Sequence, residues 1–209
     1  MHSNVLFFVI IFSFLSCSSN KQEDAVLSAI PKSVEVDVIC NPQSNSNYIG
    51  GIETGKMGIV TMGTILPDFS KQIKYDIQSV DQIVSQEDGS ELKQQVHHIY
   101  YNMNEVMLLN MDNDIVKSIT TFSPSLYLDN CIHVSSTVED LKSKYKNLTA
   151  KLNFDDSMLY LYSEENSNIL FMLMPDNILD QSKVNKKDGV MLIENIKPSG
   201  TIISIKVQN

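Results

Sequence analysis

The sequence predicts an α+β fold, mainly antiparallel β-sheet with one or two short helices, and three observations support this class. Short runs rich in β-branched and aromatic residues recur along the chain, separated by clusters of Asn, Asp, Ser, Gly and Pro. One segment, 136–145, carries helix-capping residues and apolar residues at helical spacing. Of the 209 residues, 43% are hydrophobic and 20% are charged, which suffices for one globular core.

The expected strands fall on both sides of that helical segment. Each is a short apolar run that ends at a turn-forming cluster, such as Ser-Pro-Ser at 123–125, because proline cannot donate to a central β-ladder. The run at 73–84 also fits a helix, but we expect a strand there, and we expect the last two runs to close the sheet. The expected strands are 34–40, 73–84, 96–101, 106–110, 115–122, 132–134, 148–154, 158–162, 169–174, 190–193 and 202–207.

The expected helix begins with a capping box. The Ser136 hydroxyl is placed to accept a hydrogen bond from the Glu139 backbone N–H, and the Glu139 carboxylate to accept one from the Ser136 N–H. Val138, Leu141 and Tyr145 then fall on one helical face. Acidic residues in the first turn and lysines toward the end complement the helix dipole, so a short helix is expected here.

A fainter copy of this segment occurs earlier in the chain, at 58–65. Aligning Gly63 with Ser136 superposes the apolar positions, and both segments then reach an acid followed by Phe or Leu, with a one-residue slip. Two explanations are open. The chain contains two similar strand–turn–helix units that share one sheet, or the similarity is a coincidence between short apolar segments.

The charge of the chain argues against nucleic-acid binding. Sixteen basic residues, all of them lysines, stand against 25 acidic ones, for a net charge of −9. Without arginine the chain lacks the bidentate guanidinium that most often recognises bases and phosphates. The acidic balance also repels polyanions, and we expect no nucleic-acid partner.

Three cysteines occur, Cys17, Cys40 and Cys131, and no two form a Cys-x-x-Cys pair. A zinc ribbon or a dithiol redox motif is therefore not supported. In an oxidising compartment Cys40 and Cys131 either pair with each other or remain two separate buried thiols.

The amino terminus has the pattern of a secretory signal. An apolar run at 5–15 is too short for a permanent transmembrane helix and is followed directly by Ser16 and Cys17. In this pattern the chain resembles bacterial lipoproteins, whose signal peptide ends in a small residue before a cysteine that is lipidated. The resemblance implies a signal peptide at 1–16 and acyl chains such as palmitate on Cys17.

The residues after Cys17 suit a tether. The stretch from Ser18 is short and polar, so we expect a flexible tether at 17–33 and a single β-rich domain at 34–209. Ser18 in place of Asp resembles lipoproteins that are sorted to the outer membrane of Gram-negative cells. The resemblance therefore implies a cell-envelope location and attachment to the membrane through the lipid anchor.

Candidate chemical motifs are incomplete. Residues 50–56 match the first seven positions of a phosphate-binding P-loop, but the next is Met57 instead of Ser or Thr, so we expect a glycine-rich turn between strands. His97 and His98 are strand neighbours and point to opposite faces. Cys131 and His133 make only half of a metal site. We therefore expect no metal, no cofactor and no assigned catalytic residue.

The segment 131–141 carries a second resemblance. Its sequence, C-I-H-V-S-S-T-V-E-D-L, resembles a G-I-x-V-G-S-T-x-x-D-L segment of small, uncharacterised envelope lipoproteins of Gram-negative bacteria. Both glycines of that segment are replaced here, by Cys131 and Ser135, where a left-handed backbone would be strained. The resemblance brings no known reaction.

Two functional hypotheses follow. The first is a membrane-anchored lipoprotein that acts as a non-enzymatic binding or interaction module of the cell envelope, with an envelope protein or a glycan as partner. The alternative is an envelope hydrolase or carbohydrate-acting enzyme. A cleft in which two of Asp112, Asp114, Asp129 and Glu139 converge would favour the enzyme.

Overall fold

The computed structural model describes residues 48–71, 74–85 and 91–208. These residues all belong to one unit, 39–209. The expected signal peptide, the tether and the strand at 34–40 lie outside the described residues, as do Cys17 and Cys40.

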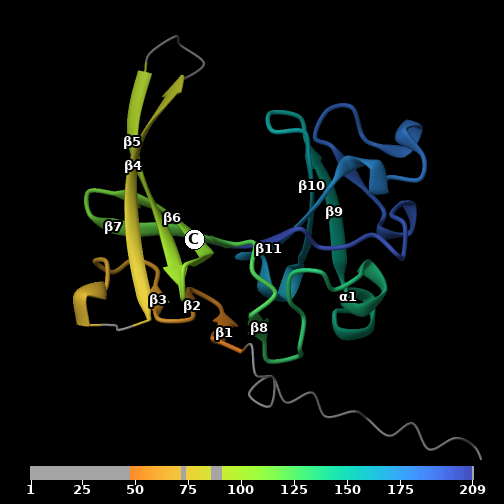
Figure 1. Ribbon diagram of the computed structural model, residues 1–209. Helices are drawn as coiled ribbons and strands as arrows, with labels where there is room; N and C mark the ends of the chain where they lie inside the picture. The colour runs from red at the N-terminus through yellow and green to blue at the C-terminus, as the bar shows by residue number, and fades with distance from the viewer. Residues whose placement is uncertain (1–47, 72–73, 86–90, 209) are drawn as a thin grey trace, which may run out of the picture. The chain divides into compact units, whose positions relative to one another are not determined.

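A nine-stranded sheet, antiparallel at every pairing, dominates the structure and confirms the predicted fold class (Figure 1). Its strand order is β12-β9-β10-β11-β13-β7-β6-β5-β4. The strands are β4 (Tyr75–Ser85), β5 (Glu91–Tyr101), β6 (Asn104–Asp112), β7 (Ile115–Thr121), β9 (Leu148–Asn153), β10 (Met158–Ser163), β11 (Ile169–Leu173), β12 (Val190–Met191) and β13 (Ser204–Gln208).

The sheet consists of two meanders of four strands that meet at its centre. The first meander is β4–β7 and the second is β9, β10, β11 and β13. In the first, the last two turns have left-handed residues, Asn102 and Met103 (φ 48° and 65°), then Asn113 and Asp114 (φ 50° and 63°). These are the backbone angles that tight two-residue hairpins require.

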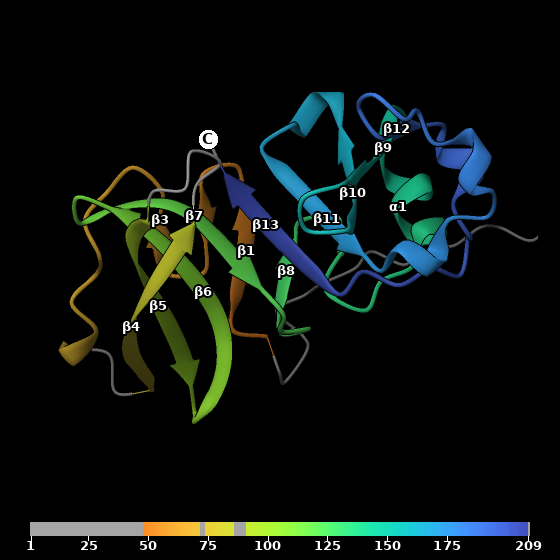
Figure 2. The same cartoon turned by 90° about the horizontal axis from the view of Figure 1, so that it is seen from above.

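The expectation that the last strand closes the sheet is wrong. β13 lies in the middle, between β11 and β7, as the view in Figure 2 shows. After β11 the chain runs through residues 174–203, which include β12 at the edge of the sheet beside β9. It then returns to the middle of the sheet as β13. Ile205 and Val207 are fully buried, and a central strand gives both of them neighbours on two sides.

A second, smaller sheet has the order β3-β2-β1-β8, with β1 and β8 parallel. The glycine-rich motif at 50–56 forms its β1–β2 hairpin, which confirms the expected turn between strands. Gly50 allows a close approach, because a Cβ there would lie 2.7 Å from the Gly58 Cα. The strands are β1 (Gly50–Glu53), β2 (Lys56–Met57), β3 (Val60–Thr61) and β8 (Leu126–Leu128).

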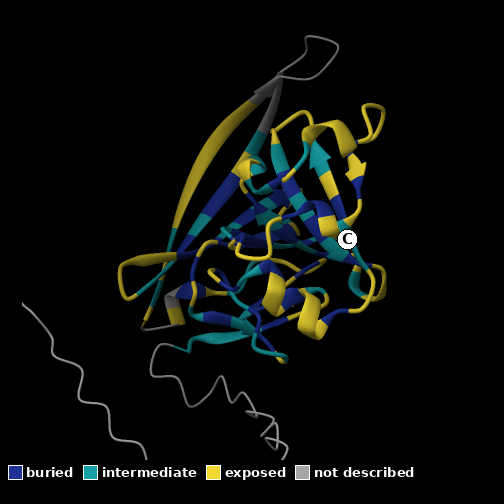
Figure 3. Ribbon diagram, turned by 90° about the vertical axis from the view of Figure 1, so that its right-hand side faces the viewer, coloured by how far each residue is buried: buried dark blue, intermediate teal, exposed yellow. Residues whose placement is uncertain are grey.

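One hydrophobic core joins the two sheets and the single α-helix of the described residues, α1 (Val138–Lys144). Figure 3 shows the buried residues along the middle of the strands. Val138, Leu141 and Tyr145 are buried in this core, which confirms the predicted helical face. The 3-10 helices are η2 (Phe69–Lys71), η3 (Glu164–Asn166), η4 (Pro175–Asn177), η5 (Gln181–Lys183) and η6 (Ile193–Asn195).

The predicted capping box is shifted by one residue. Thr137, not Ser136, is the N-cap: its Oγ1 accepts from the Asp140 N–H at 3.1 Å, and the Asp140 carboxylate accepts from the Thr137 N–H at 2.7 Å. Glu139 therefore takes no part in the box. The Ser136 hydroxyl instead accepts from the His133 N–H at 3.1 Å. The helix starts later because the Ser136 carbonyl is still paired with a neighbouring segment of the chain.

The segment that precedes the first meander pairs with β7 through a short ladder. The Gly63 N–H donates to the Val116 carbonyl at 2.9 Å, and the Val116 N–H donates to the Thr64 carbonyl at 3.0 Å. An antiparallel bridge between Ile65 and Ile115 follows. Gly63 has φ +69°.

The segment that precedes the second meander repeats this ladder just before β13. The Ser135 N–H donates to the Ile202 carbonyl at 2.8 Å, and the Ile202 N–H donates to the Ser136 carbonyl at 2.9 Å. An antiparallel bridge between Thr137 and Thr201 follows. Ser135 has φ +81°, so the left-handed residue also recurs.

The two ladders show that the similarity within the sequence has a structural counterpart. They make Gly63 equivalent to Ser135, one residue away from the sequence alignment with Ser136. With this shift the acid and apolar residue at 68–69 coincide with those at 140–141 without a slip. The first unit continues into the 3-10 helix η2, however, and only the second into an α-helix.

Candidate functional site

Of the four carboxylates that would have favoured an enzyme, Asp112 and Asp114 lie at the β6–β7 turn, and Asp129 and Glu139 lie elsewhere in the chain. Asp112 pairs with Lys117 at 3.4 Å, and Asp114 belongs to the turn between β6 and β7. Glu139 is exposed on α1. Asp129 lines a pocket of about 280 Å³, which none of the other three lines. This set therefore gives the enzymatic alternative no support.

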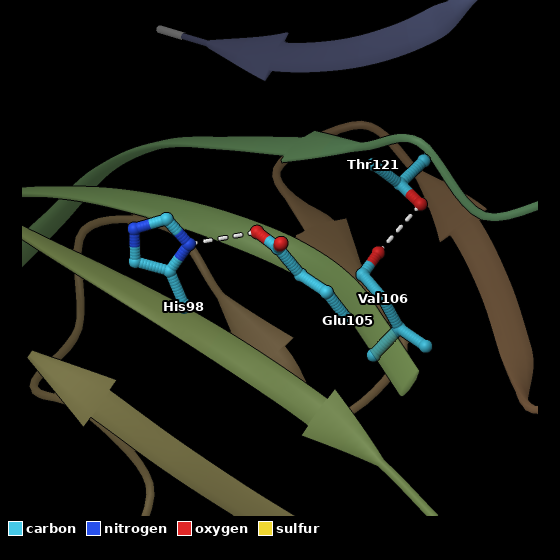
Figure 4. Close-up of polar contacts among 4 residues, drawn as sticks. All are labelled: His98, Glu105, Val106 and Thr121. Carbon is cyan, nitrogen blue, oxygen red and sulfur yellow. Dashed lines mark hydrogen bonds and ion pairs between the residues drawn. The ribbon is translucent and has the colours of Figure 1, made fainter. Parts of the chain in front are cut away.

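The adjacent histidines point to opposite faces of the sheet, as the strand pattern predicts. His97 is buried and bonds to the Ser79 hydroxyl at 2.8 Å; burial lowers the pKa of this imidazole, and the Asp114 carboxylate opposes that effect. On the other face, His98 Nδ1 lies 2.8 Å from Glu105 Oε1 (Figure 4). Each ring serves a local contact, and the two do not converge.

The half-site of Cys131 and His133 does not form. Cys131 is disulfide-bonded, and its partner lies outside the described residues. His133 Nδ1 lies 2.6 Å from the Val134 carbonyl oxygen, and its ring packs against Tyr127 with centroids 4.6 Å apart. Among the described residues, no three His, Cys, Asp or Glu side chains are grouped to hold a metal ion.

The backbone at 131–135 agrees with the second resemblance. Both positions at which that segment has glycine are left-handed here, Cys131 with φ +69° and Ser135 with φ +81°. The backbone of the motif is thus kept while the glycines are replaced, and each replacement carries the conformational cost of a side chain in the left-handed region.

The strongest candidate site is a groove on the face of the second meander that does not contact the core. We call it the outer groove; its volume is about 460 Å³, within the range of small-ligand sites. Strand alternation builds it, because Tyr160 and Tyr162 point outward from β10 while Leu159 and Leu161 are fully buried. The lining residues are Lys151, Asn153, Asp156, Tyr160, Tyr162, Ser167, Leu170, Lys206 and Gln208.

Strand register places a lysine on each side of the groove. Tyr160 on β10 lies opposite Lys151 on β9. Leu170 on β11 lies opposite Lys206 on β13. The outer groove therefore joins an aromatic strip on β10 to ammonium groups from strands that are far apart in the sequence.

Tyr160 is held as a hydrogen-bond donor. Its hydroxyl donates to the carboxylate of Asp156, in the turn before β10, and that carboxylate also accepts from the Met158 N–H at 2.9 Å. Burial and the neighbouring carboxylate raise the pKa of Tyr160 to about 12. At neutral pH the phenol keeps its proton and is unsuited to act as a base.

The side chains of the outer groove offer contacts that suit a polar ligand. Tyrosine rings present apolar faces with polar tips, and the amides of Asn153 and Gln208 add donors and acceptors. The sequence does not predict the outer groove, because tyrosines such as Tyr160 and Tyr162 are common in any β-strand. Alternation could show that Tyr160 and Tyr162 share a face, but not that this face lies away from the core.

Fold and groove together define the class: a mainly β protein with an open groove lined by polar and aromatic side chains. No protein-family model and no curated protein sequence matches the chain. Among solved structures, it is similar to the uncharacterized protein yfeY from Escherichia coli, with a TM-score of 0.50 and 15% sequence identity. The match covers 78% of this chain and 99% of that one, and it shows a shared fold.

No helix among the described residues combines the length and the apolar character needed to cross a bilayer.

Proposed function

We propose that this protein is a membrane-anchored, non-enzymatic binding module of the cell envelope, and that its outer groove binds a glycan with acidic groups. Acyl chains on Cys17 anchor it to the outer membrane, and the tether 17–33 links the anchor to the β-rich domain. The lipoprotein pattern at 1–17 supports the anchor. The disulfide at Cys131 supports an oxidising compartment such as the envelope.

The observation that carries the ligand class is the pair of tyrosines between two lysines. Tyr160 and Tyr162 stand about 7 Å apart along β10, two residues at the usual strand rise. Two rings at this spacing offer a platform for the apolar faces of sugar rings, and the surrounding amides can bond to hydroxyls.

The charge of the groove selects an acidic saccharide. Lys151 and Lys206 contribute two ammonium groups, whereas the Asp156 carboxylate is already engaged by Tyr160 and a backbone N–H. The groove is thus locally cationic on a chain whose net charge is −9. A carboxylate on the ligand would find complementary charge there and repulsion over most of the remaining surface.

Calorimetric titration of the purified full chain in neutral detergent tests the ligand class. Tetragalacturonate should bind, and neutral tetra-N-acetylglucosamine should bind at least about tenfold more weakly. Tyr162→Ala and Lys206→Gln should each weaken tetragalacturonate binding about tenfold or more. Tyr100→Ala, a tyrosine of the same sheet outside the groove, is the matched control and should bind normally. Equal binding by Tyr162→Ala, or no binding to the wild type, would refute the proposed ligand class.

Metabolic labelling with a radiolabelled fatty acid tests the anchor separately. The native chain should incorporate the label and sediment with membranes, and Cys17→Ala should do neither. An unlabelled, cytosolic native chain would overturn the envelope location while leaving the groove's binding measurement unaffected.

A further inference from the structure

The nine-stranded sheet ends in one long open edge. β4 pairs with β5 along its whole length, from Tyr75 opposite Tyr101 to Ser85 opposite Glu91, and no strand of the described residues lies on its other side. Figure 3 shows β4 as an exposed strand beside the more buried β5. The opposite edge of the sheet, β12, has only two residues. Long open edges invite pairing with another strand, and short ones do not.

The backbone groups that face outward can be identified. The Asn102 N–H donates to the Lys74 carbonyl, so even-numbered residues of β4 direct their backbone groups toward β5. The Ile77 N–H bonds instead to the side chain of Asp76, which fits an amide that faces away from β5. Ser79, Asp81 and Ile83 therefore present their N–H and C=O groups to an incoming strand, and Ile77 presents its C=O and an N–H that would exchange the Asp76 side chain for that strand.

The sequence of this edge is nearly palindromic. Residues 77–83 read Ile-Gln-Ser-Val-Asp-Gln-Ile, so a second copy placed antiparallel about Val80 puts Ile77 opposite Ile83 and Gln78 opposite Gln82. Val80 then meets its own copy on the twofold axis. Val80 and Ile83 are 45% and 59% exposed in the single chain, so the pairing would bury apolar surface that is now in water.

Charge also selects this register. Centred on Val80, Asp81 lies opposite Ser79 of the copy, and no acid faces an acid within 77–83. If the twofold axis passed through Asp81, one residue later, Asp81 would face its own copy. If it passed through Ser79, one residue earlier, Asp81 would face Ile77 of the copy. Like charges directly opposite destabilise a ladder, so the later register is disfavoured. The earlier register sets the Asp81 carboxylate against the apolar Ile77 and separates Val80 from its copy.

We propose that β4 is a self-association edge, through which two copies of this chain form one continuous antiparallel sheet about a twofold axis at Val80. Val80 and its copy form a non-hydrogen-bonded pair, in which side chains approach most closely. The flanking pairs supply about eight backbone hydrogen bonds. Such an isologous contact closes on itself as a dimer. The proposal does not rest on the outer groove, which lies on the other meander.

Disulfide trapping tests the register. In the full chain in neutral detergent, Val80→Cys oxidised with copper phenanthroline should give a covalent dimer on a non-reducing gel. Gln82→Cys is the matched control on the same face, and it should stay monomeric because its copy lies four residues away across the axis. Equal trapping of the two variants, or no trapping of Val80→Cys, would overturn the proposal.

Analytical ultracentrifugation tests the dimer without a cross-link. The wild type should sediment as a dimer at micromolar concentration, and Val80→Lys as a monomer, because it places two like charges on the axis. An unchanged circular dichroism spectrum would confirm that Val80→Lys is folded. A monomeric wild type, a dimeric Val80→Lys, or trapping of Val80→Cys to a different protein would each refute self-pairing.

Discussion

The two meanders share a plan and differ in what they present to solvent. Each has four strands that run from the outer part of the sheet toward its centre. Each is preceded by the same short ladder, made with β7 in the first case and with the residues just before β13 in the second. The first joins its last two strands by a tight turn, whereas the second inserts 174–203 between them. The outward face of the first carries His98 against Glu105, and that of the second carries Tyr160 and Tyr162. One architecture therefore supports two surfaces, and the outward residues decide the chemistry of each.

The left-handed positions sharpen this comparison. Gly63 in the first segment has φ +69°, and its equivalent in the second segment, Ser135, has φ +81°. Gly58 and Cys131 are also left-handed, but they lie five and four residues before these positions and are not equivalent. The first unit meets the backbone requirement with glycine, at low steric cost. The second keeps the conformation with side chains, and the disulfide at Cys131 adds a covalent constraint there.

The largest effect should come from the core that the meanders share. Phe171 on β11 and Met107 on β6 are almost fully buried in one hydrophobic cluster. Phe171→Ala should lower the free energy of unfolding by about 3–5 kcal/mol, and Met107→Ala by about 2–5 kcal/mol. Urea unfolding should remain one cooperative transition, and the exposed Phe154→Ala should change it by less than about 0.5 kcal/mol. Two separate transitions would show that the meanders fold independently.

Next in size is the constraint that only the second unit has. Cys131→Ser should lower the free energy of unfolding by about 2–4 kcal/mol, because the cross-link restricts the unfolded chain. Under reducing conditions the difference from wild type should vanish. Peptide mapping without reduction should recover Cys131 linked to another cysteine. If Cys17 is acylated, that partner is Cys40, the remaining cysteine of the sequence. A free Cys131 thiol in the purified, non-reduced protein would contradict the expectation.

The helix cap is also specific to the second unit. Thr137→Ala should cost about 1 kcal/mol at pH 7, measured by urea unfolding. Hydrogen bonds from the backbone N–H and the hydroxyl of Thr137 hold the pKa of the Asp140 carboxyl below its ordinary value. Because the folded pKa is the lower one, this stabilisation is present above the unfolded pKa of about 4 and is lost as the pH falls through the folded pKa. The gap between wild type and Thr137→Ala should therefore narrow below about pH 4.

A control variant on the same helix isolates that pH effect. Ser143→Ala removes a hydroxyl that donates to the Asp140 carbonyl and not to its carboxylate. Its difference from wild type should not depend on the protonation of Asp140. If the Thr137→Ala gap stayed constant from pH 7 to pH 3, the capping carboxylate would not be the source of the stability.

The smallest effect should come from exchanging the equivalent left-handed residues. Ser135→Gly should raise the free energy of unfolding, and Gly63→Ser should lower it, each by about 1 kcal/mol. A side chain at Gly63 meets no atom within 4 Å, so its cost is confined to the backbone. Ser135→Ala, which keeps a Cβ, should show no gain. If both substitutions changed the free energy of unfolding in the same direction, Gly63 and Ser135 would not be equivalent positions.

Sequence reasoning succeeded where the signal was local. The strands at 96–101 and 106–110, with their turn, and the meander at 148–174 follow from alternation and turn residues and are confirmed. The sequence predicts the helix but favours Ser136 as its cap, whereas the structure has Thr137 there. Both residues are good caps, and the choice depended on whether Ser136 was still paired to Ile202, a partner far along the chain.

By itself, the sequence determined the class of fold, the alternation of the strands within 96–110 and 148–174, and the helical face, because each depends on residues a few positions apart. Only the tertiary structure decided that β13 lies beside β7, that the ladder repeats with a shift of one residue, and that Tyr160 and Tyr162 face away from the core. These outcomes depend on which distant strands share a sheet and which of its faces is covered. A strand's alternation pattern is the same for either face, so the choice is made by packing between segments far apart in the chain.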